Sequence, residues 1–287
     1  MTRISQCKRP LLALISIWLL CVCQNSAKKT SLPQAAKHVT VLVDISKSDV
    51  AEVRAGMPQG SHLLESLFRN STSVRDDLER VRSSLARARD HVQDLRVAKS
   101  TFFALVEPDG TILRSDRMPD VMAGKNLWAA VPKAAQVVSG TTVEISGSLA
   151  EAAGVRGRND AQWFLLVPII VDEKVRGAYV TGWSWSAYAY RLETALRNDL
   201  KTVARREQAR EPLVYVYVDV GGAVYGAPLS PEVNANAINR EVSLTSVTRN
   251  QVWSKVIEIT GREFALAVGR APELGEDAAI AVLRSET

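Results

Sequence analysis

The chain has 287 residues, of which 46% are hydrophobic and 23% charged, proportions that are typical of globular proteins and exclude wholesale disorder. The formal net charge is +5, but Arg3, Lys8 and Arg9 lie in the first 23 residues, and beyond them 33 basic residues (36 minus 3) balance 31 acidic ones. Such an even balance does not indicate a nucleic-acid-binding protein.

The first 23 residues have the three-part pattern of a secretory signal peptide. Three positive charges precede the uncharged run LLALISIWLLCVC, and the polar segment QNSAKKTS follows it. These 13 uncharged residues would span roughly 20 Å as a helix, short of the roughly 30 Å hydrocarbon core of a membrane. We therefore predict a cleaved signal peptide at residues 1–23 and export to the bacterial cell envelope.

The three cysteines, Cys7, Cys21 and Cys23, all lie in this segment, so the exported body contains neither a disulfide framework nor a thiolate metal site. Cys23 resembles the lipid-attachment cysteine of bacterial lipoproteins, with Leu20 at a suitable position but Val22 larger than usual; Cys21 is a poorer match. Two alternatives follow. Either Cys23 or Cys21 carries a lipid that anchors the protein to the membrane, or both belong to the apolar part of the signal and the protein is periplasmic.

Residues 24–61 are predicted to form a tether and a short N-terminal segment. The polar residues 24–37 indicate a flexible link, and the alternation in 38–44 favours a short strand. Met57-Pro58-Gln59-Gly60 is a turn signal. One or two helical turns are expected at 62–68.

From Ser73 onward the spacing of the apolar residues predicts a long helix. The apolar positions step by four and three residues, Ser73 is a suitable N-cap, and Asp76 and Asp77 are favoured in the first turn. The stripe is narrow, so it packs either within its own chain or against a second copy. Its members are Val74, Leu78, Val81, Leu85, Ala88, Val92 and Leu95.

Two similar sets of strands follow. Residues 102–106 and 111–113 read as a hairpin joined by the turn residues Pro108-Asp109-Gly110. Short helices at 119–139 and three further strands, at 141–145, 163–171 and 175–185, complete an antiparallel sheet. A helix at 186–210 leads to a second, smaller set, whose predicted elements are strands at 213–220 and 223–226, a helix from Pro231 to Asn239, and strands at 251–260, 262–270 and 278–284.

This order of elements resembles the double Cache family, the PAS-like extracytoplasmic sensor domains of bacterial receptors. The segments that carry the likeness are FFALVEPDGTILRSD, MAGKNL, AQWFLLVPIIVDEKVRGAYVTGWSW and VYVYVDVGGAVYGAP, over roughly residues 62–285. The resemblance implies an α+β protein with a long N-terminal helix and two PAS-like modules, each a five-stranded antiparallel sheet with inserted helices. The expected domains are 62–190 for the helix and first module, 191–211 for a connecting helix and 212–287 for the second module.

The resemblance also implies a small-molecule pocket between the sheet and its inserted helices. Lys125 lies in the inserted region that covers the pocket in the family. Arg114 and Asp116 end the second strand, where they would offer polar contacts to a ligand or form a surface ion pair. Trp163, Tyr179 and Trp183 are either an aromatic pocket wall or packing for the long helices; Tyr179 and Trp183 share one strand face. The Arg and Trp pattern of the amino-acid-binding members is absent, so amino-acid binding is not supported.

The sequence contains little evidence for a metal site, a catalytic nucleophile or a phosphate-binding loop. His38, His62 and His91 are scattered, no metal-ligand spacing occurs, and no nucleophile or phosphate-binding motif is present. The arginines of Gly154-Val-Arg-Gly-Arg158 would clamp a carboxylate or phosphate, or simply lie in a solvated loop. We predict no enzyme activity, metal or cofactor.

The predicted function is that of an exported, non-catalytic sensor that binds an unidentified small molecule in the first module. It would act through a protein partner in the envelope and would not bind nucleic acid. The alternative is an envelope scaffold without a ligand, whose modules are filled by tryptophan side chains and mediate protein contacts.

Overall fold

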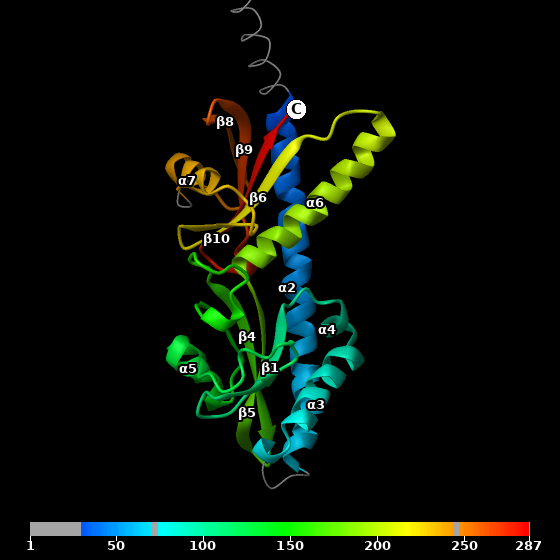
Figure 1. The fold of residues 1–287 in the computed structure, drawn as a ribbon, viewed down its shortest axis with the longest axis vertical. Helices are drawn as coiled ribbons and strands as arrows, with labels where there is room; N and C mark the ends of the chain where they lie inside the picture. The colour runs from blue at the N-terminus through cyan, green and yellow to red at the C-terminus, as the bar shows by residue number, and fades with distance from the viewer. Residues whose placement is uncertain (1–29, 70–73, 244–246, 287) are drawn as a thin grey trace, which may run out of the picture.

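The computed structural model describes residues 30–69, 74–243 and 247–286. The predicted signal peptide, with Cys21 and Cys23, lies outside these ranges. Helix α2 (Leu32–Arg69) runs along two stacked modules (Figure 1). Its 38 residues give a length of about 57 Å at 1.5 Å per residue. The first module lies at the end of α2 farther from the described chain ends, and the second beside its beginning.

The expectation of a tether, a strand at 38–44 and a turn at 57–60 was wrong for residues 32–61. These residues belong to α2, because a buried stripe at steps of three and four residues continues through the β-branched run and past Pro58. Two glycines of α2 allow neighbouring side chains to pack closely against the helix. A Cβ at Gly56 would lie 2.7 Å from Leu95, and one at Gly60 would lie 2.6 Å from the Tyr179 ring.

The helix predicted from Ser73 is shorter and broken. Val74–Asp76 form a 3₁₀ turn, α3 spans Leu78–His91 and α4 spans Gln93–Val97. Asp77 caps α3 by accepting a hydrogen bond from the Arg80 N–H at 3.0 Å. The break falls at Val92, whose backbone is extended. The apolar stripe packs within the chain, against α2 and the first two strands, as one of the two alternatives predicted.

The first module is a five-stranded antiparallel sheet with the strand order β2-β1-β5-β4-β3. The predicted strands are confirmed to within about two residues at their ends. The elements are β1 (Phe102–Val106), β2 (Ile112–Ser115), α5 (Leu127–Ala130), η3 (Pro132–Ser139), β3 (Val143–Gly147), η4 (Ala150–Ala152), β4 (Gln162–Val171) and β5 (Lys174–Ser184).

Helix α6 (Trp185–Glu207) crosses from the first module to the second, which repeats the topology with the order β7-β6-β10-β9-β8. The repetition predicted from the sequence is therefore confirmed at the level of strand order, whereas the exact domain limits stay a prediction. The elements are β6 (Leu213–Val220), β7 (Ala223–Gly226), α7 (Glu232–Glu241), β8 (Val252–Ile259), β9 (Arg262–Arg270), η6 (Pro272–Leu274) and β10 (Ala278–Ser285).

Each sheet is buried on both faces, and one hydrophobic core runs through both modules. On one face, residues of the two sheets pack against α2, α3 and α6 in a single cluster. The other face of the first sheet is covered by α5 and η3, and that of the second by α7. Alternation of side chains along each strand decides which residues reach which face.

Arg54 of α2 ties the two modules together on the helix side. Its Nε and Nη2 atoms donate to the Glu144 carboxylate at 2.9 Å, and Nη1 donates to Glu273 Oε2 at 2.8 Å. Glu144 belongs to the first module and Glu273 to the second. Hydrogen bonding to Glu144 is the main cause that raises the pKa of Arg54, so the guanidinium stays charged at this junction.

The start of α2 and the end of β10 lie side by side (Figure 1). Ser31 Oγ donates to Glu286 Oε1 at 2.8 Å, and Arg284 Nη1 donates to His38 Nε2 at 2.8 Å. A ring nitrogen that accepts from a guanidinium belongs to a neutral imidazole. Burial, followed by the neighbouring Arg284 charge, lowers the pKa of His38 to about 4.

We expect His38 to make the fold sensitive to mild acid. The unfolded chain takes up this proton near pH 6.5, whereas the folded chain resists it until about pH 4; stability is therefore present above 6.5 and is lost as the pH falls between these values. Lys37 adds to the effect, while Asp199 and Glu286 oppose it. Urea unfolding should show that the free energy of unfolding of the native chain is roughly 1–2 kcal/mol lower at pH 5 than at pH 7, and that His38→Gln lacks this difference. Equal losses in both would contradict this assignment.

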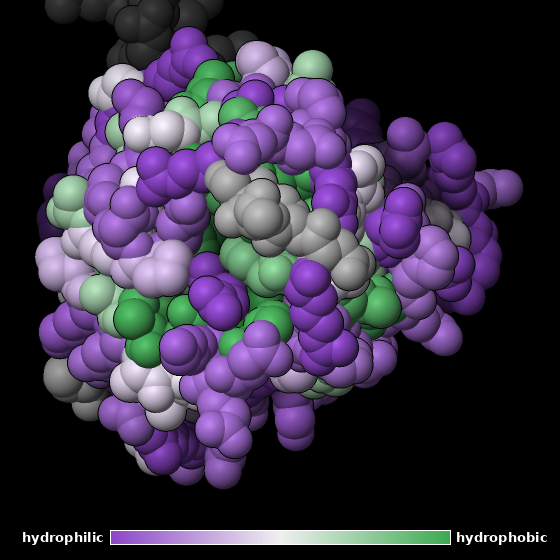
Figure 2. Space-filling view, turned by 90° about the horizontal axis from the view of Figure 1, so that it is seen from below, coloured by the Kyte–Doolittle hydropathy of each residue, from purple (hydrophilic) through white to green (hydrophobic). Residues whose placement is uncertain are grey.

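Figure 2 shows the end of the first module farthest from the described chain ends. The visible surface is mostly hydrophilic, with small separate groups of apolar residues. Among the described residues, no helix has the length and apolar character needed to cross a membrane.

Candidate ligand-binding site

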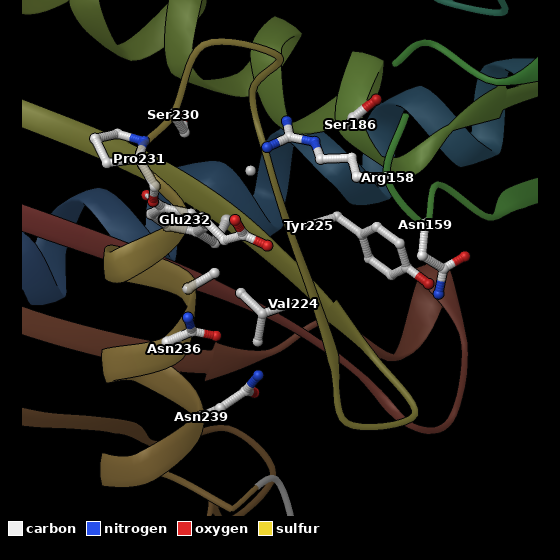
Figure 3. A pocket seen from close by; sticks show the side chains of 13 residues that line it. Arg158, Asn159, Ser186, Val224, Tyr225, Ser230, Pro231, Glu232, Asn236 and Asn239 are labelled. Atoms are coloured by element: carbon white, nitrogen blue, oxygen red, sulfur yellow. Dashed lines mark hydrogen bonds between the residues drawn. The ribbon is translucent and has the colours of Figure 1, made fainter. Parts of the chain in front are cut away.

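A cavity of about 180 Å³ lies between the second module and a loop of the first (Figure 3). Strands β6 and β7 and helix α7 form one side of it, and the loop that precedes β4 supplies the other, together with the first turn of α6. Its lining residues include Arg158, Asn159, Ser186, Tyr217, Tyr225, Ser230, Glu232, Asn236 and Asn239.

Asp160 fixes the first-module loop to α6. Its carboxylate accepts hydrogen bonds from the Gly154 and Val155 N–H groups at 2.7 and 3.1 Å, and from Ser186 N and Oγ at 3.1 and 2.6 Å. Asp160 is only 5% exposed. A carboxylate is favoured at the N-terminus of a helix, where unpaired N–H groups and the helix dipole meet it. The loop is thus held where it closes the cavity.

Arg158 connects this loop to the second module. Its Nη2 atom donates to the carbonyl oxygens of Ala227 at 3.0 Å and Pro228 at 3.3 Å. The sequence indicated a clamp for a carboxylate or phosphate, or a solvated loop. The guanidinium instead points toward the second module and has protein carbonyls as partners (Figure 3).

One buried hydroxyl in the wall of the cavity lacks a well-formed partner. Ser230 lines the cavity and is 8% exposed, yet its Oγ makes no well-formed hydrogen bond; Asn234, which is 3% exposed and lies outside the lining, has none at Nδ2. Both side chains lie beside the Tyr217 hydroxyl, whose pKa is raised chiefly by burial. Buried polar groups are normally satisfied, so the Ser230 hydroxyl in this wall is suited to a further polar partner.

Helix α7 presents a polar stripe to the cavity. Glu232, Asn236 and Asn239 lie at steps of four and three residues, which places them on one face of the helix. Figure 3 shows the Glu232 carboxylate pointing from the start of α7 toward the side occupied by Arg158. The stripe combines one negative charge with two amides, each of which both donates and accepts hydrogen bonds.

The three predicted aromatic residues lie elsewhere, in the core on the helix side of the first sheet. Trp163 and Trp183 stack with ring centroids 4.3 Å apart, and Trp183 stacks on Tyr188 of α6 at 4.6 Å. Tyr179 stacks on Phe103 at 5.7 Å. All of these side chains are at most 1% exposed. This arrangement matches the packing alternative, and their contact with a ligand stays a prediction.

The three predicted polar residues do not converge. Asp116 accepts from Arg89 Nη1 at 2.9 Å and from the Phe103 N–H at 2.7 Å, so its ion pair is with α3 and not with Arg114. Burial raises the pKa of Asp116. Lys125 pairs with Glu151 at 3.1 Å on the surface. Arg114 is half-buried in β2.

The region that the resemblance implied as the pocket of the first module is filled with apolar side chains. The face of the sheet under α5 and η3 holds one hydrophobic cluster, which includes Phe102, Met122, Leu127 and Phe164. None of the six residues predicted to bind ligand lines the cavity of Figure 3. Sequence reasoning missed this cavity; its signal was the repeated asparagine of VNANAINR after a proline, in the second module.

The described part of the chain contains no cluster of three or more histidine, cysteine, aspartate or glutamate side chains arranged to hold a metal ion. The polar groups at the cavity are amides, hydroxyls, one carboxylate and one guanidinium, a set suited to hydrogen bonding.

Two modules with the same strand order, joined by one helix and flanked by a long N-terminal helix, define the double Cache, PAS-like fold, as the sequence predicted. No family model matches the sequence, and no curated protein does. Among solved structures, a domain of a sensory box/GGDEF family protein from Vibrio parahaemolyticus is similar, with a TM-score of 0.52, 11% identity, and coverage of 92% of this chain and 97% of that one.

Two further structures have the same fold. The extracellular domain of a histidine kinase gives a TM-score of 0.50 at 11% identity, covering 92% of each chain. An extracellular ligand binding receptor from Desulfohalobium retbaense gives 0.50 at 11% identity, covering 87% of this chain and 40% of that one. The chain therefore corresponds to less than half of the receptor. At this identity the likeness concerns the fold.

Proposed function

We propose that this chain is an exported, non-catalytic sensor domain that binds a small molecule in the cavity between its modules and acts through a protein partner in the envelope. The observation that carries the proposal is the polar lining of the cavity, which includes the buried Ser230 Oγ without a well-formed hydrogen bond and is closed by a loop from the other module. The fold, shared with the sensory structures above, supports a sensory role.

The cavity has a position from which a ligand would influence both modules. Arg158 and Asn159 belong to the first module, and Ser230 and Asn236 to the second. A ligand shifts the equilibrium between two arrangements only by the difference between its affinities for them. If the modules separate in the free protein, a molecule that contacts both walls binds the closed arrangement more tightly than the separated one.

The envelope scaffold without a ligand is the second candidate. The apolar filling of the first module, where the resemblance placed the pocket, favours it. The two functions differ in one measurable respect, which is whether any small molecule stabilises the protein.

A thermal-shift screen of the purified full chain against metabolites tests the proposal. A ligand at a hundred times its dissociation constant should add about 2.7 kcal/mol to the free energy of unfolding and raise the melting temperature. Arg158→Ala should remove most of the shift, whereas Arg176→Ala, at an exposed position of β5, should retain it. If no compound raises the melting temperature, the scaffold function replaces the sensor.

A further inference from the structure

The cavity offers a ligand mainly groups that both donate and accept hydrogen bonds. These are the hydroxyls of Tyr217 and Ser230 and the amides of Asn236 and Asn239. An ionised ligand group only donates or only accepts hydrogen bonds, so it can use only the acceptors or only the donors of these side chains. A ligand hydroxyl is both, so it can pair with every one of these side chains.

The charges at the cavity do not favour an ionic ligand. Arg158 contributes one positive charge and Glu232 one negative charge. The Arg158 guanidinium already donates to the carbonyls of Ala227 and Pro228, so its bidentate fork is not presented whole to a carboxylate or phosphate. The net charge of the lining is therefore zero, and it lacks the free cation that anion binding would require.

Small apolar surfaces complete the cavity. Val224, Tyr225 and Ala235 belong to its lining, and Tyr225 is 8% exposed. The volume of about 180 Å³ is below the range of about 300–1,000 Å³ for pockets that hold drug-sized molecules. A compact ligand with both C–H and hydroxyl surfaces fits this combination.

We propose, on the basis of the function proposed above, that the ligand is an uncharged polyhydroxylated molecule of single-ring size, such as a monosaccharide or a cyclic polyol. Its hydroxyls pair with the amides of α7 and with the hydroxyls of Tyr217 and Ser230. Its C–H face lies on Val224 and Ala235. Glu232 accepts one ligand hydroxyl without forming an ion pair.

The experiment is a comparison of ligand classes on the full chain by thermal shift and titration calorimetry. The probes, at equal concentrations, are glucose, galactose, ribose and myo-inositol, set against zwitterionic amino acids, dicarboxylates and inorganic phosphate. A neutral polyol is expected to raise the melting temperature, and the charged classes are not. Binding of a zwitterion, a carboxylate or phosphate without binding of any polyol would overturn the assignment of ligand class and leave the sensor function standing. No response to any probe or to the wider library would overturn both.

Variants at exposed helix positions separate the ligand class from folding. Asn236→Ala and Asn239→Ala should each weaken polyol binding about tenfold, with no change in circular dichroism. Asn198→Ala, an exposed asparagine in helix α6, is the matched control and should bind as the native chain does. Glu232→Gln keeps an oxygen that accepts the ligand hydroxyl and loses only the charge assistance of that bond, so it should weaken binding less than Asn236→Ala does. A loss of binding in Glu232→Gln as large as in Asn236→Ala would contradict a neutral ligand.

Discussion

Replacing Trp183 with alanine is expected to lower the free energy of unfolding by about 3–5 kcal/mol. The indole is fully buried and lies in a continuous stack between Trp163 and Tyr188, so its removal leaves a cavity at the point where sheet, α2 and α6 meet. The neighbours come from regular elements and can collapse into the space only in part.

The size of the loss should fall toward the lower end of this range. Trp183 Nε1 is buried without a hydrogen-bond partner, so truncation also removes an unsatisfied polar group. Trp183→Phe, which keeps a ring and lacks this N–H, should therefore lose much less stability than Trp183→Ala. Urea unfolding followed by circular dichroism gives the free energy of unfolding of the native full chain and of the two Trp183 variants.

Trp253 provides the matched control, because it is a half-buried tryptophan at the edge of the second module's core. Trp253→Ala should lose less than half as much stability as Trp183→Ala. Equal losses at the two positions would mean that the aromatic stack contributes nothing beyond ordinary burial of an indole.

Replacing Asp49 with alanine is expected to destabilise the protein by about 3 kcal/mol. Asp49 lies in α2 and is 3% exposed, and its carboxylate accepts hydrogen bonds from Tyr188 Oη at 3.0 Å and from Arg191 Nη2. Alanine would leave a buried hydroxyl and a half-buried guanidinium without their acceptor. Burial raises the pKa of Asp49, opposed by the nearby Arg191 charge, so the carboxylate depends on these two partners.

A series of variants separates the two contacts of Asp49. Tyr188→Phe removes one hydrogen bond and should lose about 1 kcal/mol. Asp44→Ala, at an exposed position of the same helix, should stay within about 0.5 kcal/mol of the native chain. Unfolding curves in urea at pH 7 measure each difference. An Asp49→Ala variant as stable as Asp44→Ala would show that α2 and α6 are held by apolar packing alone.

The strands were predictable because their signals are local. Turn residues such as Pro108-Asp109-Gly110, together with alternating apolar runs, locate the hairpins, and β1 agrees with its predicted bounds. Helix α2 was not predictable in this way. Its buried stripe passes through Ser46 and Gly60, which are not apolar, and the β-branched residues near its start have strand propensity. Packing along two modules overrides that local preference.

The misread helix also explains why the sequence left two alternatives open for the aromatic residues. Alternation correctly puts Tyr179 and Trp183 on one face of β5, as both belong to the helix-side core. Whether that face meets a ligand or a helix depends on where α2 lies, which the sequence signal at 32–61 did not reveal. The cavity between the modules draws on residues about seventy positions apart, Arg158 and Ser230 among them, and no local pattern predicts such a meeting.

The hydrogen bond between Ser31 and Glu286 brings the first and last described parts of the chain to one point on the surface. A unit whose entrance and exit coincide can be placed inside a loop of another protein without stretching its host, because only a small gap has to be bridged. The first module then lies at the far end of α2, separated from that junction by the length of the helix (Figure 1).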